Sequence, residues 1–191
     1  MAKIKLILNL PFAWIFLPFY WLSSERAKID EDINVFYRVL KASHPTNYTI
    51  AFYVLFATTT EFRSVFYMRI GHLSALLKFV WPPMQLLSFS IKSRNFGGGC
   101  FVQHGWSTVI DAERVGKNFW VNQNVTIGWR KDGHPTIGDN VRIGTGAVVL
   151  GKITIGDNVN IGANAIVVED IPTNCTVCSP KAQIVKYHKT N

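Results

Sequence analysis

The sequence predicts an α+β protein in which a helical N-terminal region is followed by stacked coils of short extended segments. β-Branched residues recur every six positions in the second half of the chain, and glycine often follows them. A six-residue period fits neither a helix nor a long alternating strand, whereas coils of short segments bury such residues by stacking. Two apolar stretches with helical spacing precede the repeat, which places helices before the coils.

Composition and charge narrow the classes of protein. Of the 191 residues, 48% are hydrophobic and 13% aromatic, which indicates a folded chain. The net charge of +8 is spread along the sequence rather than massed in one run, so it favours a phosphate-bearing cofactor and anionic lipid over nucleic acid. Three cysteines form no disulfide framework, and Cys175 and Cys178 lack the second pair of a zinc site. We therefore expect a cytoplasmic protein at the inner face of the cell membrane.

Residues 1–28 form the first expected segment. The nineteen residues from Leu6 to Ser24 carry no charge, but Pro11 and Pro18 interrupt them. Many aromatic side chains and flanking basic residues are typical of a segment in the lipid headgroup layer, so we predict an interfacial anchor. A buried contact between subunits and a single membrane span are the alternatives. No signal cleavage motif follows, and we expect the segment to be retained.

Residues 29–92 form the expected helical region. One helix is predicted over Asp30–Ala42, capped by Asp30 or Asp32, and another over Thr60–Leu77, capped by Thr60. Both helices have an apolar side, so they are expected to pack on each other.

Residues 93–176 carry the six-residue repeat, and residues 177–191 form a C-terminal tail. Because one unit cannot bury its own apolar side, we expect its aliphatic residues to point into a shared interior of roughly four coils. Asn and Asp residues near the glycines suit corners with a positive φ. The aliphatic residues in register are Val109, Val115, Val121, Ile127, Ile137, Ile143, Val149, Ile155, Ile161 and Val167.

Two breaks in the repeat predict the functional site, because a unit that departs from the pattern gives up stacking. At the first break, His104 stands where the repeat has glycine. At the second, four extra residues between Ile127 and Ile137 must bulge from a corner, and this loop carries His134. Neutral histidine, with a reference pKa of about 6.5, can remove the proton of a hydroxyl group during acyl transfer.

The repeat and its two histidines resemble the hexapeptide-repeat acyltransferases, in particular serine acetyltransferases and exopolysaccharide O-acetyltransferases. The resemblance runs from about Asn95 to Pro172, and Asp132-Gly133-His134-Pro135 stands where the family has Asp-Arg-His-Pro. It implies a left-handed parallel β-helix of triangular section, a homotrimer, acetyl-CoA as co-substrate and no metal ion. It also implies that His104 is the general base and His134 the second active-site histidine.

Family active sites lie between neighbouring subunits, so the resemblance implies that His104 of one chain faces the His134 loop of another. Asp111 or Glu113 is a candidate to orient His104. Small residues beside the groove would admit the pantetheine arm of acetyl-CoA, and a basic residue in the tail would meet its nucleotide end. The candidate cofactor contacts are Gly128, Gly146, Ala147, Gly162, Ala163 and Lys181.

Two departures from the serine acetyltransferase pattern concern the acceptor. Gln103 stands where the family has an aspartate that helps hold the serine ammonium, and Gly133 where it has an arginine that binds the carboxylate. Trp106 and Trp129 could stack on a pyranose ring, or equally pack at a corner. We therefore predict an O-acetyltransferase acting on a sugar hydroxyl in cell-surface polysaccharide biosynthesis. The alternatives are a serine acetyltransferase of cysteine biosynthesis and a scaffold without catalysis.

Overall fold

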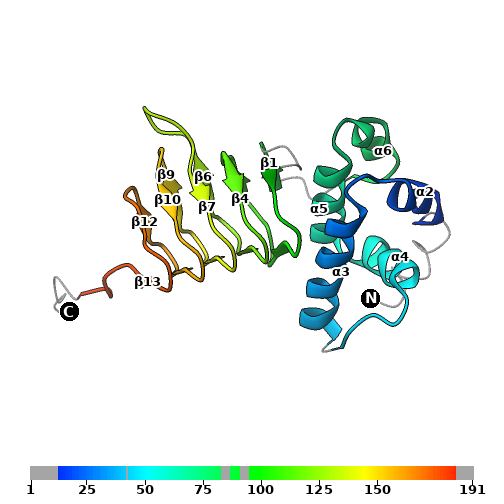
Figure 1. Cartoon of the computed structure of the whole chain (residues 1–191), viewed down its shortest axis with the longest axis horizontal. Coiled ribbons are helices and arrows are strands. Elements are labelled where there is room, and N and C mark those ends of the chain that lie inside the picture. Colours follow the sequence, from blue (N-terminus) through cyan, green and yellow to red (C-terminus); the bar gives the residue numbers. More distant parts are fainter. Residues whose placement is uncertain (1–12, 42, 83–86, 91–94, 184–191) are drawn as a thin grey trace, which may run out of the picture.

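The computed structural model describes residues 13–41, 43–82, 87–90 and 95–183. Helices gather at one end of the elongated molecule, and a parallel β-helix extends from them towards the C-terminus (Figure 1). The predicted order, helices first and then coils of short strands, is confirmed. The predicted boundary near residue 93 lies outside the described residues.

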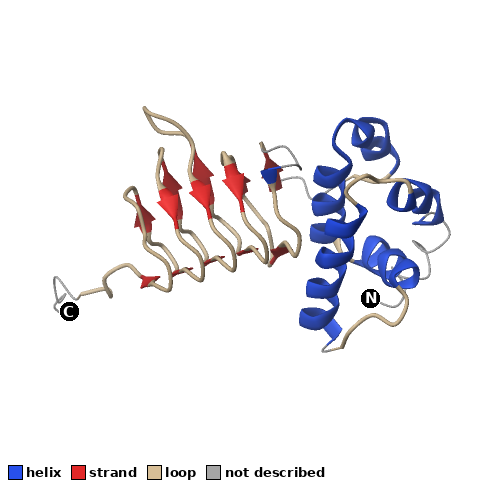
Figure 2. Ribbon diagram, viewed as in Figure 1, coloured by secondary structure: helices blue, strands red, loops and turns tan. Residues whose placement is uncertain are grey.

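The helical region contains more helices than the sequence predicts (Figure 2). In chain order they are η1 (Trp14–Phe16), α2 (Leu17–Trp21), α3 (Arg26–Lys41), α4 (Tyr48–Thr58), α5 (Thr60–Ile70), η2 (Gly71–Leu73) and α6 (Ser74–Val80). Gly71, with a φ of +57°, ends α5 well before Leu77, and Thr59 rather than Thr60 is its N-cap. The sequence does not predict α4, because a helix that is apolar on all sides shows no period of 3.6 residues.

The described part of the first segment, residues 13–28, packs on the other helices. Phe16 and Tyr20 are fully buried. The ring of Phe16 lies 4.3 Å from that of Phe56, and the ring of Tyr20 stacks 4.6 Å from that of Phe52. These two aromatic side chains therefore pack against α4, whereas the sequence predicts that they contact lipid headgroups. The apolar surface of α4 shields their rings from water. No helix of the described residues is long and apolar enough to cross a membrane.

The first predicted helix begins at Arg26 rather than Asp30, so neither Asp30 nor Asp32 caps it, and Asp32 instead forms a buried ion pair. Its carboxylate accepts hydrogen bonds from Arg69 at 2.9 and 3.0 Å and from the backbone N–H of Cys100 at 2.7 Å. Arg69 also donates to the carbonyl oxygens of Phe96 and Gly97. These bonds compensate two charges that have lost water, and they join α3 and α5 to the first coil.

The β-helix consists of three parallel sheets, one on each side of the coil. Sheet A is formed by β1 (Leu87–Phe89), β3 (Thr108–Ile110), β6 (Thr126–Gly128), β9 (Val148–Leu150) and β12 (Ile166–Val167). Sheet B is formed by β4 (Arg114–Val115), β7 (Thr136–Ile137) and β10 (Thr154–Ile155). Sheet C is formed by β2 (Phe101–Val102), β5 (Trp120–Val121), β8 (Arg142–Ile143), β11 (Asn160–Ile161) and β13 (Thr176–Val177). The five strands of sheets A and C give about five coils, one more than the sequence predicts.

The predicted inward register holds for nine of the ten aliphatic residues, which are buried. Val109 is the exception, because it is 39% exposed and Ile110 points inward in its place. The spacing explains the difference. Ile110 pairs with Ile127, and the chain between them is one residue shorter than the chain between regular neighbours such as Arg142 and Asn160. The missing residue lies after β3, because Val115 follows Ile110 by five positions, whereas Ile155 follows Val149 by six, and this shifts the register at β3 by one residue.

Asparagines stack along the corner between sheets B and C. Asn118, Asn140, Asn158 and Asn174 all have a φ between +54° and +61°. Each side-chain amide of the first three donates to the amide oxygen of the next coil at 2.9 to 3.0 Å. Asparagine tolerates this backbone conformation better than most residues, so the expectation of positive φ at the corners is confirmed.

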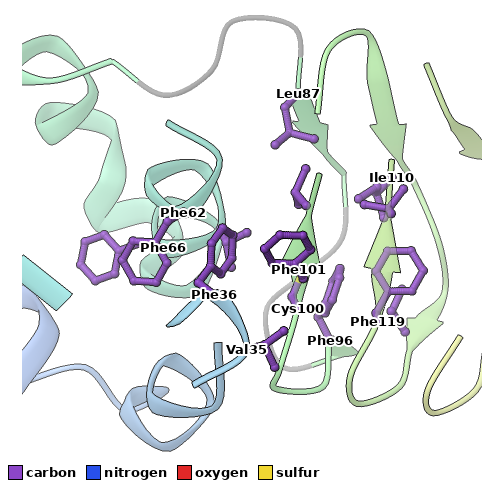
Figure 3. Close-up of a cluster of buried hydrophobic side chains, with 14 of the residues drawn as sticks. Val35, Phe36, Phe62, Phe66, Leu87, Phe96, Cys100, Phe101, Ile110 and Phe119 are labelled. Atoms are coloured by element: carbon purple, nitrogen blue, oxygen red, sulfur yellow. The ribbon is translucent and has the colours of Figure 1, made fainter. Parts of the chain in front are cut away.

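An aromatic cluster fixes the helices to the first coils of the β-helix (Figure 3). The ring of Phe36 in α3 lies 5.4 Å from that of Phe62 in α5 and 4.8 Å from that of Phe101 in β2. Phe96 and Phe119, 5.8 Å apart, continue the cluster into the β-helix. Because β2 leads directly to His104, this packing sets the position of the candidate site.

Candidate active site

Two of the three edges of the β-helix carry the candidate site residues. The C–A edge is made of the turns from sheet C to sheet A, at residues 103–107, 122–125, 144–147 and 162–165. The A–B edge is made of the turns from sheet A to sheet B, at residues 111–113, 129–135, 151–153 and 168–170. Sheet A lies between these two edges.

His104 lies on the C–A edge, and its side chain is exposed. Its φ of +64° is in the left-handed region, which costs a residue with a Cβ about 1–2 kcal/mol. Backbone hydrogen bonds hold the turn to the next coil: the N–H of Gln103 donates to the carbonyl of Val121 at 2.8 Å, and the N–H of Asn124 to that of Trp106 at 2.7 Å. The strained turn therefore presents an imidazole to the outside from an anchored backbone.

The four extra residues lengthen the turn from sheet A to sheet B into the loop 129–135 on the A–B edge, so the predicted bulge is confirmed (Figure 1). Thr126 of β6 pairs with Val148 of β9, and the chain between them is longer by these four residues than the chain between Val148 and its partner Ile166 in β12. Arg130 and Gly133 pair as an antiparallel bridge inside the loop. The backbone N–H of Lys152 in the next coil donates a hydrogen bond of 3.4 Å to the carboxylate of Asp132, which holds the loop against the β-helix.

Asp111 lies beside His134, whereas the sequence analysis offers it as an orienting acid for His104. The Oδ1 atom of Asp111 is 3.4 Å from the Nδ1 atom of His134. That nitrogen is buried and makes no hydrogen bond in the described residues, so the two atoms are close without being hydrogen-bonded. Glu113, the other candidate, is exposed on the same A–B edge. Within one chain neither acid reaches His104, because both follow β3 while His104 precedes it.

The geometry defines the role that Asp111 can play. A carboxylate beside Nδ1 favours the proton on that nitrogen and leaves Nε2 free for a substrate. A hydrogen bond between this nitrogen and Asp111 would hold the ring of His134 in one orientation on the A–B edge.

The two histidines lie on opposite edges of sheet A and do not meet within one chain. A side of six residues at about 3.3 Å per residue makes the sheet on the order of 15–20 Å wide. That width is far beyond the reach of one acceptor hydroxyl.

The candidate cofactor contacts divide between the edges. Gly146, Ala147, Gly162 and Ala163 share the C–A edge with His104, whereas Gly128 ends β6 beside the A–B edge. Lys181 is exposed beyond the last strand.

The stacking of the coils also requires a glycine at position 146. A Cβ on Gly146, which has a φ of +71°, would collide with the side-chain oxygen of Asn164 in the next coil. Beside that coil, a groove of about 510 Å³ runs between β12 and the tail, lined among others by Ile166, Val177 and Pro180.

The other predicted substrate contacts lie near the histidines. Gln103 is half-buried next to His104. Trp106 on the C–A edge is 55% exposed and Trp129 on the A–B edge 60% exposed. Neither indole is packed in the interior of its own chain, so stacking on a substrate and contact with another chain both remain available to them.

Sheet A has a partly aliphatic outer surface, which the spacing of the repeat does not reveal. In its outward row Val109, Val148 and Ile166 are aliphatic, with Ile166 73% exposed, whereas Ser88 and Thr126 are polar. Half-buried Leu150 and exposed Val168 lie beside this row, towards the A–B edge. The outward positions of the other sheets hold Arg, Thr and Asn, with Phe101 and Trp120 in sheet C as the exceptions. The sequence contains this pattern, because the residues next to the inward-pointing ones are aliphatic only in the strands of sheet A.

No three His, Cys, Asp or Glu side chains gather as a metal site would require within the described ranges. The three cysteines are free thiols: Cys100 is buried, Cys175 half-buried and Cys178 exposed. Burial and the neighbouring carboxylate of Asp32 raise the pKa of the Cys100 thiol, so it stays protonated.

Comparison with known proteins finds one matching family model and several similar serine acetyltransferases. Residues 134–168 match the family model described as bacterial transferase hexapeptide (six repeats). The serine acetyltransferase of Staphylococcus xylosus is 46% identical over 97 residues, which are 48% of this chain and 45% of that protein. That of Helicobacter pylori (strain ATCC 700392 / 26695) is 40% identical over 96 residues, 48% of this chain and 56% of that protein. The chain thus spans only about half the length of these curated relatives.

Solved structures show the same fold. The serine acetyltransferase of Neisseria gonorrhoeae in complex with serine has a TM-score of 0.61 and 26% identity, over 83% of this chain and 68% of that one. Isoform 3 from Entamoeba histolytica in complex with cysteine has a TM-score of 0.60 and 23% identity, over 99% of this chain and 67% of that one. The likeness covers helices and coils together, which confirms the left-handed β-helix preceded by helices. Residues 134–168 are thus similar to the bacterial hexapeptide transferases, and the chain is similar in sequence over about half its length, and in fold, to serine acetyltransferases.

Proposed function

We propose that the protein is an acetyl-CoA-dependent O-acetyltransferase whose acceptor is L-serine. The proposal is supported by relatives named serine acetyltransferases, 40% and 46% identical over about half of this chain. It is supported further by the fold shared with the Neisseria gonorrhoeae enzyme in complex with serine. The serine acetyltransferase of Brucella abortus in complex with coenzyme A has the same fold, with a TM-score of 0.59.

The observation that carries the proposal is the position of the two histidines. They occupy the two edges that bound sheet A, and sheet A is the one with an aliphatic outer surface. If three copies turn sheet A towards a common axis, the C–A edge of each copy faces the A–B edge of the next. His104 of one chain then meets His134 of its neighbour, and burial of Ile166, Val168 and Val109 stabilises the assembly.

The chemistry follows from this composite site. His104 removes the proton of the acceptor hydroxyl while the oxygen attacks the thioester carbonyl of acetyl-CoA. The carbon–sulfur bond then breaks, and the imidazolium returns the proton to the departing thiolate, so CoA leaves as a thiol. A backbone N–H would stabilise the negative oxygen of the tetrahedral intermediate. His134, held by Asp111, contributes a second imidazole to the acceptor.

The pantetheine arm of acetyl-CoA would lie between two chains, along the C–A edge below His104. The small residues Gly146, Ala147, Gly162 and Ala163 would border it there. The groove beside Pro180 and the amine of Lys181 would then lie towards the nucleotide end.

A sugar hydroxyl, the acceptor that the sequence analysis prefers, is the second candidate. Neutral Gln103, the missing side chain at Gly133 and the exposed Trp106 and Trp129 favour it. None of the relatives reported above is a polysaccharide acetyltransferase, and they support serine instead. Membrane attachment has no support in these comparisons or in the described part of the first segment.

The test is an assay of CoA release from acetyl-CoA with the full chain, using L-serine, free sugars and nucleotide sugars as acceptors. We expect release that depends on L-serine, together with O-acetylserine as product. Release that depends on a sugar and not on serine would overturn the serine acceptor. The absence of CoA release with every acceptor would overturn the enzyme and leave a scaffold.

A further inference from the structure

We infer that Arg130 binds the carboxylate of the acceptor, an inference that rests on L-serine being that acceptor. Serine needs a cation for its carboxylate, and the residue that precedes His134 is a glycine. The loop 129–135 nevertheless holds a guanidinium, at Arg130, and its fold brings that residue next to Gly133.

The two residues face each other across the antiparallel bridge. The N–H of Arg130 donates to the carbonyl of Gly133 at 3.2 Å, and the N–H of Gly133 donates to the carbonyl of Arg130 at 2.9 Å. Residues opposed in this way project their side chains to the same side. The side chain of Arg130 therefore leaves the loop on the side where one at position 133 would, directly before His134.

The backbone explains why the cation is at position 130 rather than 133. Gly133 has a φ of +147°, which residues with a Cβ rarely adopt. A Cβ there would also lie 3.3 Å from the Cβ of Lys152 in the next coil. An arginine at position 133 would require a different loop, whereas Arg130 reaches the same side from unstrained backbone.

The next coil supports the stem of Arg130. Gly151 has no side chain and a φ of +102°, and a Cβ built there would lie 3.6 Å from the Cβ and 3.8 Å from the Cδ of Arg130. Because Gly151 has no side chain, the aliphatic part of the Arg130 side chain can lie against the backbone of the next coil. The carboxylate of Asp132 accepts a hydrogen bond from the N–H of Lys152, which holds the loop against that coil.

The guanidinium itself is free to bind a ligand. Arg130 is exposed, and none of the ion pairs found among the described residues involves it. Its planar fork can donate two parallel hydrogen bonds to a carboxylate, which an ammonium group cannot do. The same loop therefore offers the imidazole of His134 for the hydroxyl end of serine and the guanidinium of Arg130 for the carboxylate end.

The experiment compares L-serine with L-serinamide, which has the hydroxyl and amine but no carboxylate. We expect Arg130→Gln to lower kcat/KM for L-serine by about 10- to 100-fold, mainly through a higher KM, because a charge-assisted pair is lost. The kcat/KM for L-serinamide should stay close to that of the unmodified protein. Arg130→Lys should fall between the two. Lys131→Gln, which removes the same charge from the adjacent residue, is the matched control and should keep the original preference for L-serine.

The outcomes separate the inference from the proposed function. If the unmodified protein acetylates L-serine and Arg130→Gln keeps its preference over L-serinamide, Arg130 does not bind the carboxylate while the function stands. Equal losses with both acceptors in a folded Arg130→Gln variant would also overturn the inference, since they point to a damaged loop. If the unmodified protein acetylates neither acceptor, the proposed function fails and the inference with it.

Discussion

Two histidines form the candidate site, and the carboxylate beside one of them comes from another coil. Asp111 and His134 are far apart in the chain, and only the stacking of one coil on the next brings them to 3.4 Å. Both histidines can be found in the sequence because each interrupts a regular repeat. Asp111 cannot be found in this way, and neither can the outward position of Val109, which follows from the shorter turn after β3.

Replacing the proposed base tests its role in proton transfer. We expect His104→Ala to lower the turnover number by about 10²- to 10⁴-fold, because no other group takes the hydroxyl proton. The variant should keep its circular dichroism spectrum, since the side chain is exposed. CoA release at the original rate would remove His104 as the base.

Asp111 tests the orientation of the second imidazole. We expect Asp111→Asn to lower kcat by roughly 10-fold, because the amide no longer favours one tautomer of His134. Glu113→Gln removes an exposed carboxylate from the same edge and should change little. Steady-state kinetics of both variants measure the difference, and equal effects would contradict a specific role for Asp111.

Among the elements, the strands of the coils follow from the sequence more closely than the helices do. A period of six repeated many times leaves few alternatives, while α4 has no polar side to reveal its period. The contact between the helices and the coils also depends on residues far apart in sequence. Asp32 and Arg69 look like surface charges of two amphipathic helices, yet the fold buries both against Cys100.

This buried pair gives a prediction about stability. We expect Arg69→Met to lower the free energy of unfolding by about 3–5 kcal/mol, because it leaves the carboxylate of Asp32 buried without its partner. The double variant Asp32→Leu with Arg69→Met should lose less, since no charge remains buried. Urea unfolding followed by circular dichroism measures both, and a single variant as stable as the original protein would show that the pair does not hold the helices to the coils.

In the whole molecule, the shared interior of the coils is predictable, whereas the assembly of chains is not. Residues such as Ile166 stand beside the inward register, and the sequence alone does not tell whether their sheet faces water or another copy. The structure separates the sheets, because only sheet A combines aliphatic outer residues with histidines on both of its edges.

Charge placed on sheet A tests the assembly. We expect Ile166→Lys to convert the proposed trimer into monomers, because three lysines would be brought together without water. Thr154→Lys, which adds the same charge to the exposed outer face of sheet B, should leave the assembly intact. Analytical ultracentrifugation distinguishes the species, and a trimer that survives Ile166→Lys would show that sheet A is not the contact.

An active site shared between two subunits also predicts how much activity returns when two inactive variants assemble together. His104→Ala and His134→Ala should each be inactive alone, yet trimers that contain both chains should recover about one third of the original activity per site, because one of their three sites then holds both intact histidines. The measurement is CoA release by the mixed assemblies, purified through different tags on the two chains. Recovery near one third is the result we predict, and no recovery in assemblies shown to contain both chains would contradict an active site shared between subunits.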